Sequence, residues 1–250
     1  MELILPQWGM ALPAIGALST TRSCGSSLPP YDDGKGDGGL NLGMHVGDVP
    51  EDVQRNRTQL RRQLPAEPVW LTQVHGATVV DAAEVDGAVE ADASFSTQPG
   101  VVCAVMTADC LPVLLADRCG KVVAAAHAGW RGLAAGVLEK TVARMHAAAA
   151  GELVAWLGPA IGPAHFEVGE EVRQTFLALS PAAAACFRSI DGRPGKFLAD
   201  LYRLAAIRLS SAGVASVSGG GFCTVSAPHR FYSFRRDGVT GRMATMIWIR

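Results

Sequence analysis

Two motifs decide how this chain folds: Thr107-Ala-Asp-Cys-Leu-Pro112 and, after a further apolar segment, His127-Ala-Gly-Trp-Arg-Gly132. An apolar run over 101–107 leads into the first motif and is typical of a strand. The segments 112–117 and 121–127 are typical of the next two strands, with a turn over 118–120 between them. We therefore expect Cys110 and His127 to lie at the ends of neighbouring strands, where their side chains can converge.

Composition excludes several kinds of partner. The chain has 250 residues, of which 49% are apolar and 18% charged, and its net charge is −1. Such a length can bury a sizeable core without disulfides. Nucleic acids and anionic membranes are bound by basic surfaces, so neither is an expected partner. The arginine-rich stretch 55–62 is interpreted as one solvated helix face rather than a polyanion site.

The cysteines and the N-terminus indicate a cytoplasmic protein. The six cysteines include no C-x-x-C pair and are interpreted as reduced thiols, most of them small core residues. The segment 1–8 has no basic residue before its apolar run, which argues against a secretory signal. No apolar run approaches the roughly 20 residues of a membrane-spanning helix.

The patterns along the chain predict fold class α+β with α/β-like layers, in which a single domain, residues 1–250, contains mixed β-sheets flanked by helices. Helices are predicted over 49–64 (with Asp48 and Glu51 as a capping box), 131–149, 168–179 and 196–211. The other predicted strands are 2–8, 15–21, 69–72, 77–80, 153–157, 214–218, 231–235 and 242–249. The segment 23–39, rich in Gly, Ser and Asp, is predicted to be a long loop.

Three polar residues beside small or turn residues suggest a metal site: His75 in Q-V-H-G, Cys110 and His127. Thiolate and imidazole suit zinc, and three protein ligands leave the fourth tetrahedral position open for water or substrate. Such a site lowers the pKa of bound water and polarises an electrophile. His75 lies 35 residues before Cys110, and His127 lies 17 after it. These spacings match no short-loop structural zinc motif and favour a catalytic site built from distant strand ends.

Two other interpretations of these residues remain open. Histidines and cysteines near strand ends are often core or loop residues with no chemical role. Alternatively, Cys110 is the nucleophile of a Cys–His hydrolase, with His127 as its base and Asp109 or another acid orienting the imidazole. Both functional interpretations require Cys110 close to His127, and only the metal site requires His75 as well.

Three further residues are candidates for substrate binding. Asn41 follows the Gly-rich segment and can position a substrate or stabilise a turn. Arg57 and Arg131 can bind phosphate or carboxylate, because the guanidinium fork fits both groups. Arg131 also lies near a predicted helix N-terminus, where anions bind well.

At these residues the chain resembles the YfiH-like family, whose members are also called laccase-domain proteins, polyphenol oxidases and purine nucleoside phosphorylases. The motifs occur in the family's order and span nearly the whole chain: T-T-R, N-L-G-M-H-V-G-D, N-R, Q-V-H-G, E-A-D-A, T-A-D-C-L-P-V, H-A-G-W-R-G, G-P-A-I-G and F-Y-S-F-R-R-D-G-V-T-G-R. One departure lies near Cys24, where S-C-G-S-S-L-P-P-Y and an added Gly/Asp segment lengthen the route to N-L-G.

The resemblance implies zinc at His75, Cys110 and His127, although copper has also been attributed to the family. It implies phosphorolysis of adenosine, inosine and guanosine, with 5′-methylthioadenosine as a further substrate and adenosine deamination as a side activity. Purine nucleosides and phosphate are therefore the expected partners. One branch of the family is linked to editing of peptidoglycan precursors. For a conventional multicopper oxidase, the six histidines of the chain are too few.

Overall fold

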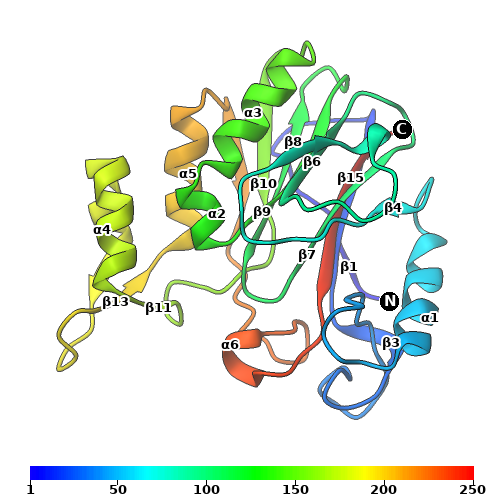
Figure 1. Cartoon of the computed structure of the whole chain (residues 1–250), viewed down its shortest axis with the longest axis horizontal. Helices are drawn as coiled ribbons and strands as arrows, with labels where there is room; N and C mark the ends of the chain where they lie inside the picture. Colours follow the sequence, from blue (N-terminus) through cyan, green and yellow to red (C-terminus); the bar gives the residue numbers. More distant parts are fainter.

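Two large β-sheets pack face to face, and helices cover their outer faces (Figure 1). The computed structural model describes residues 1–250. In spatial order, the five-stranded sheet contains β1 (Leu3–Ile4), β2 (Ile15–Thr20), β15 (Met243–Ile249), β7 (Val102–Thr107) and β4 (Pro68–Val69). The six-stranded sheet contains β14 (Ser216–Gly219), β10 (Leu153–Leu157), β8 (Leu111–Asp117), β9 (Val123–Ala128), β6 (Ala93–Ser96) and β5 (Val79–Asp81).

Both sheets are mixed, because β4–β7, β10–β14 and β5–β6 pair in parallel whereas the other neighbours are antiparallel. A third, small sheet contains β11 (Glu167–Gly169), β13 (Lys196–Ala199) and β12 (Phe187–Ser189). The helices are α1 (Pro50–Arg61), α2 (Trp130–Ala134), α3 (Val137–Ala147), α4 (Glu170–Leu179), α5 (Leu201–Ser211) and α6 (Phe234–Asp237), with 3-10 turns at Ala82–Glu84 and Pro181–Cys186. The predicted class of mixed sheets flanked by helices is confirmed.

Side-chain alternation along the central strands creates the layers. In β7, Cys103 and Val105 face the six-stranded sheet, where they pack with Leu114 and Ala116 of β8. The intervening residues of β7 face the α1 side and pack with Leu60. The other face of the six-stranded sheet packs against α2, α3, α4 and α5. Because side chains point alternately to opposite faces of a strand, one apolar strand serves two separate cores.

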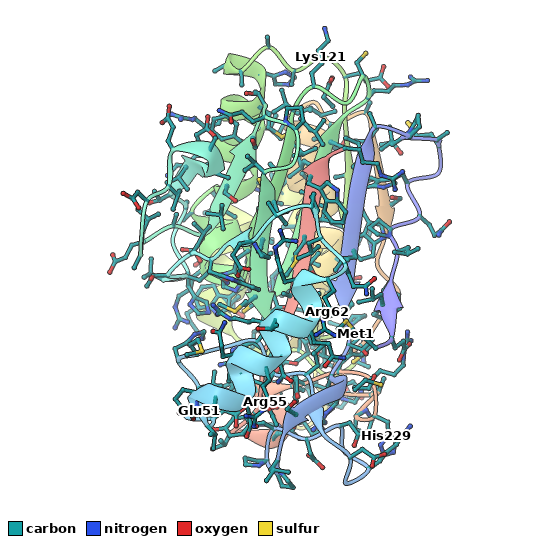
Figure 2. The ribbon with its side chains drawn as sticks, turned by 90° about the vertical axis from the view of Figure 1, so that its right-hand side faces the viewer. Met1, Glu51, Arg55, Arg62, Lys121 and His229 are labelled. Carbon is teal, nitrogen blue, oxygen red and sulfur yellow. The ribbon has the colours of Figure 1, made fainter.

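Helix α1 lies across the outer face of the five-stranded sheet, with Glu51 and Arg55 along its visible surface and Arg62 immediately after its last residue (Figure 2). Arg55 pairs with Asp52, and Arg62 is exposed. This agrees with the interpretation of the arginine-rich stretch as a solvated face, except that Arg57 lines a pocket described below. None of the helices has the length and hydropathy needed to cross a membrane.

The helix predicted over 131–149 is two helices, α2 and α3. Gly136, between them, has a φ of 83°, in the left-handed region that interrupts a right-handed helix. The apolar periodicity continues across this break, and for that reason the sequence alone predicted one element.

Two other predicted helices begin as strands. The segment 168–179 starts in β11, and the segment 196–211 starts in β13, which pairs with both β11 and β12. Asp200 then ends the strand character, because its carboxylate accepts a hydrogen bond from the backbone N–H of Arg203 and caps α5. Edge pairing in a small sheet is a tertiary contact that helical periodicity does not reveal.

Four local predictions are wrong. The predicted strand over 231–235 is absent, because the hydroxyl of Ser233 accepts the N–H of Arg236 and starts α6. The capping box is also absent: Val49 is the N-cap of α1, with no side-chain bond. The predicted loop 23–39 contains strand β3 (Ser23–Ser27), and the N-terminal strand is only two residues long. Strand β6, described below as part of the site, was not predicted.

Candidate metal centre

His75, Cys110 and His127 converge where the chain passes from one large sheet to the other. Cys110 lies between β7 and β8, which belong to different sheets, and His127 lies in β9 opposite Pro112. His75 comes from the connection between β4 and β5. The ligand atoms of the three residues lie within 4.8 Å of one another, and the Cys110 Sγ is 3.8 Å from His75 Nε2. This group can hold a metal ion.

Asp92, immediately before β6, holds two of the three residues in place. Its Oδ1 lies 2.8 Å from Nδ1 of His127 and accepts the backbone N–H of His75 at 2.9 Å. Its Oδ2 accepts the backbone N–H groups of Gly76, at 2.6 Å, and Val74, at 3.2 Å. A carboxylate on one ring nitrogen fixes the orientation of a histidine and leaves the other nitrogen for a metal. One buried side chain therefore positions both histidines.

The backbone is strained at His75 and immediately before Cys110. His75 has a φ of 60°, and Asp109, the residue before Cys110, has a φ of 90°. Residues other than glycine occupy this region at an energetic cost, and such strain gathers at functional sites. Beside His75, Gln73 exchanges two hydrogen bonds with the backbone of Met106 in β7, at 2.8 and 2.7 Å. These bonds and those of Asp92 hold the Q-V-H-G turn in its strained form.

Asp109 forms no hydrogen bond with His127, whereas the catalytic acid of a Cys–His hydrolase would form one. Its carboxylate accepts the hydroxyl of Thr224 at 2.5 Å and the backbone N–H of Arg235 at 2.6 Å. Its backbone carbonyl accepts the N–H of Ile161 at 2.9 Å. Asp109 therefore anchors the loop that carries Cys110 to two C-terminal segments and to the G-P-A-I-G loop.

The glycines of H-A-G-W-R-G leave room for the site. A Cβ at Gly129 would lie 2.9 Å from the Cys110 sulfur and 3.3 Å from the ring of His75. A Cβ at Gly132 would lie 2.7 Å from the carbonyl oxygen of Gly76. The motif needs glycine at these positions because other ligand-bearing segments pack directly against its backbone.

The electrostatics favour a thiolate beside an imidazolium. Burial raises the pKa of the Cys110 thiol, but hydrogen bonds and positive charge from His127 and His75 outweigh burial and bring that pKa to about 6. Burial lowers the pKa of His127, but its hydrogen bonds to Asp92 and Cys110 raise it to about 9. Burial raises the pKa of Asp92, whereas hydrogen bonds from His127 and Gly76 lower it below its usual value. The thiolate is the form of cysteine that binds metals and attacks electrophiles.

The three residues open into a pocket of about 740 Å³, within the roughly 300–1,000 Å³ of small-molecule sites. Besides the three, it is lined by Met44, His45, Arg57, Trp70, Leu71, Thr72, Gln73, Ala88, Met106, Thr107, Ala108, Phe234 and Arg242. Met44 and Phe234 are 47% and 59% exposed, so their apolar surfaces are available to a ligand.

The three predicted substrate residues have different positions. Arg57 lines the pocket, and its guanidinium stacks on Trp70 at 4.1 Å. Asn41 is fully buried outside the pocket lining; its side-chain oxygen accepts the N–H groups of Gly43 and Arg242. These hydrogen bonds support a turn, and a role of Asn41 in positioning a substrate stays a prediction. Arg131 is exposed and stacks on Trp130 at 4.6 Å, and neither residue lines the pocket.

Sequence reasoning missed three residues of this region. Asp92 lies in E-A-D-A, one of the recognised motifs, yet nothing in its spacing linked it to His127. His45 and Arg242 lie in the motifs N-L-G-M-H-V-G-D and T-G-R, but only the fold brings these segments, almost 200 residues apart, to one pocket.

Comparison with known proteins identifies the family. A family model described as "Multi-copper polyphenol oxidoreductase laccase" matches residues 16–250. The purine nucleoside phosphorylase of Pseudomonas aeruginosa is 52% identical over 247 residues, which cover 99% of this chain and 98% of that protein. Purine nucleoside phosphorylase YfiH of Escherichia coli is 51% identical over 251 residues, covering 99% of each chain. The chain belongs to the YfiH-like laccase-domain family.

Solved structures show the same fold in other YfiH-like proteins. A Neisseria meningitidis protein is 48% identical, with a TM-score of 0.91 over 99% of this chain and 98% of that one. YlmD from Geobacillus stearothermophilus is 31% identical, with a TM-score of 0.83 over 95% and 93% of the two chains. The YfiH-like fold of this chain is thus found in relatives of widely different sequence identity.

Proposed function

We propose that this chain is a zinc-dependent purine nucleoside phosphorylase that acts in the pocket containing His75, Cys110 and His127. The observation that carries the proposal is that one pocket joins a thiolate–imidazole group to two arginines. The relatives named purine nucleoside phosphorylase, at 51–52% identity over nearly the whole chain, support the same activity.

The donor set fits zinc. A thiolate and two imidazoles are ligands typical of zinc, and three protein ligands leave one position for a substrate or water. Zinc held there would supply a Lewis acid to the pocket. Asp92 keeps Nδ1 of His127 occupied, so that Nε2 is the nitrogen that would hold the metal. Because the pKa of His127 is about 9 in the metal-free protein, metal binding would release the Nε2 proton. The low pKa of Cys110, about 6, keeps this ligand deprotonated at neutral pH.

Phosphorolysis defines what the remaining residues must do. A phosphate oxygen bonds to C1′ of the ribose while the C1′–N9 bond breaks. The electron pair of the C1′–N9 bond leaves with the purine, which takes up a proton. The protein must therefore hold phosphate in line with the breaking bond. Arg57 is our candidate for this task, since its guanidinium lines the pocket and suits phosphate oxygens. Met44 and Phe234 offer apolar surface to the purine ring.

The proposed substrates are adenosine, inosine, guanosine and 5′-methylthioadenosine. Adenosine deamination is a proposed side activity, because a metal held by His75, Cys110 and His127 would supply a Lewis acid beside a bound purine, which is the chemistry that hydrolysis at C6 needs. The free thiols agree with a cytoplasmic enzyme, which we retain as part of the proposal.

The test uses purified protein of known metal content, incubated with inosine and phosphate, with and without a chelator. We expect hypoxanthine and ribose 1-phosphate to form only when phosphate is present, to disappear with chelator and to return with zinc. Activity in metal-free protein would refute the zinc requirement. A zinc-loaded protein that forms no ribose 1-phosphate from any of the four nucleosides would refute the phosphorylase.

A metal-free Cys–His hydrolase, for example one that edits peptidoglycan precursors, is the second candidate. The observation in its favour is the series Cys110, His127 and Asp92, in which a carboxylate orients an imidazole beside a thiolate. Such an enzyme would be inactivated by thiol alkylation and would be insensitive to chelators. The chelator arm of the experiment above separates it from the zinc enzyme.

A copper-dependent polyphenol oxidase is the third candidate. Two histidines and one cysteine also suit copper, and the matching family model is described as a polyphenol oxidoreductase. Oxygen consumption with phenols, measured on copper-loaded and zinc-loaded protein, tests it. Oxidation that requires copper and exceeds the rate of phosphorolysis would favour this candidate.

A further inference from the structure

Two arginines and a histidine lie together in the pocket, and none of them belongs to the metal group: Arg57 of α1, Arg242 immediately before β15, and His45 of the N-L-G-M-H-V-G-D segment. They come from three separate parts of the sequence. Burial, followed by the positive charges of Arg242 and Arg57, lowers the pKa of His45. The two arginines are therefore close enough to His45 to disfavour a further positive charge there.

Neither arginine forms an ion pair with a carboxylate. Both are half-buried, and burial lowers the pKa of each. The negative groups that act on the two arginines from a distance are Glu67 for Arg57 and, for Arg242, Cys110 followed by Asp109. Glu67 and Asp109 accept hydrogen bonds from Trp70 and from Thr224 respectively. Half-buried cations without a bound carboxylate are costly unless an anion accompanies them.

The geometry of the guanidinium groups leaves donors free. Nε and Nη2 of Arg57 both donate to the carbonyl oxygen of Leu42, at 3.0 and 2.8 Å, which fixes the fork and leaves Nη1 without a hydrogen bond. Nη1 of Arg242 donates to the carbonyls of Thr240 and Gly241, at 3.0 Å each, which leaves Nε and Nη2. The two groups are thus held by backbone carbonyls, and their remaining N–H groups are available to a ligand.

We propose that Arg57, Arg242 and His45 form a phosphate subsite beside the metal group. The inference rests on the proposed phosphorylase activity only for the identity of the ligand, which would be inorganic phosphate as substrate and the phosphate group of ribose 1-phosphate as product. Arg242 acts together with Arg57 in place of Arg131, whose exposed guanidinium lies outside the pocket lining. The fixed forks suit the oxygens of a phosphate dianion.

Calorimetric titration of the metal-loaded protein with inorganic phosphate, without nucleoside, tests the subsite directly. We expect Arg242→Gln and Arg57→Gln each to weaken phosphate binding roughly tenfold to a hundredfold, the usual effect of losing a charge-assisted bond. Arg62→Gln removes the same charge from an exposed position of the same segment and should leave binding unchanged. Ribose 1-phosphate as a second ligand should show the same pattern.

Because Arg57 also supports the backbone at Leu42, its variant can lose structure. His45→Gln, which alters an exposed side chain, and Arg242→Lys, which keeps the charge but removes the fork, are then decisive. We expect the Cys110→Ala variant, which lacks one metal ligand, to keep its phosphate binding. This result would show that the arginines, rather than the metal, hold the anion. Wild-type affinity in both Arg242→Gln and His45→Gln, or a loss confined to Arg131→Gln, would overturn the subsite.

The subsite and the activity can fail separately. Phosphate binding that depends on Arg242 and His45, without formation of ribose 1-phosphate from any nucleoside, would leave the subsite standing and refute the phosphorylase. Phosphorolysis whose phosphate dependence is unchanged in Arg242→Gln and His45→Gln would refute the subsite and leave the phosphorylase standing.

Discussion

The pocket has two charged regions that are held in opposite ways. In the metal region, Asp92 accepts hydrogen bonds from the His127 ring and from the backbone of the His75 turn, so every charged group has a partner within the protein. In the cationic region, Arg57 and Arg242 donate hydrogen bonds only to neutral backbone carbonyls, and Arg57 also stacks on Trp70. A fully partnered region is preorganised for a metal, whereas an unpartnered one provides charge for a ligand to neutralise.

Replacement of Cys110 by alanine should have the largest effect, because it removes a ligand and the thiolate that His127 and His75 stabilise. We expect metal content and phosphorolysis to fall to background, measured by elemental analysis and by product formation. Added zinc should also lose its effect on the melting temperature, since a ligand stabilises only the form that it binds. Cys119→Ala, at an exposed turn, is the matched control. A Cys110→Ala protein that keeps activity would mean that the cysteine is structural.

Asp92→Asn removes the shared support of the metal region while keeping its ligands. Loss of such a support typically lowers metal affinity or activity about 10–100-fold. Competition with a chromogenic chelator gives the zinc affinity. The control is Asp117→Asn, since Asp117 is also buried and accepts backbone N–H groups, those of Lys121 and Gly151, elsewhere in the fold. Equal zinc affinity in the two variants would contradict the role given to Asp92.

Gly129→Ala tests the packing between the ligand segments. Its Cβ would meet the Cys110 sulfur at 2.9 Å, so that the cysteine or the backbone has to shift. Overpacking of this kind costs about 1–3 kcal/mol. We expect the melting temperature and the zinc affinity to fall together. A variant that is less stable but binds zinc normally would show that the shift is absorbed away from Cys110.

The smallest expected effect is on the pH dependence of thiol alkylation, which tests whether Cys110 of the metal region is a thiolate. The folded-state pKa of Cys110, about 6, lies below its ordinary value, so the thiolate is present above pH 6 and is lost as the pH falls through it. In metal-free protein, alkylation of Cys110 by iodoacetamide should therefore rise between about pH 5 and 7 and then level off. Zinc should protect the thiol. An alkylation rate that rises only above pH 8 would contradict the low pKa.

Much of the metal region could be predicted from the sequence. Cys110 and His127 interrupt apolar strands separated by one short turn, so antiparallel pairing had to bring them close together. His75 was a candidate because it lies at a strand end beside the turn glycine Gly76, and the resemblance to the family supported it. Asp92 could not be predicted, because its partners are 16 to 35 residues away and only the register of β6 against β9 aligns it with them.

Little of the cationic region, by contrast, could be predicted from the sequence. The guanidinium of Arg57 suited phosphate on chemical grounds, but the sequence equally favoured Arg131, which the fold leaves exposed on α2. Arg242 and His45 carry no local signal, since a lone arginine or histidine near a turn is usually solvated.

By itself, the sequence determined the layered mixed sheets and the group His75, Cys110 and His127, because strand periodicity and short turns act over a few residues. Tertiary structure alone decided that Gly136 divides the long helix, that 196–199 pairs as a strand, and that Ser233 starts a helix. It also decided which cations face the pocket. These outcomes depend on contacts between segments far apart in the chain, and local pattern contains no information about such contacts.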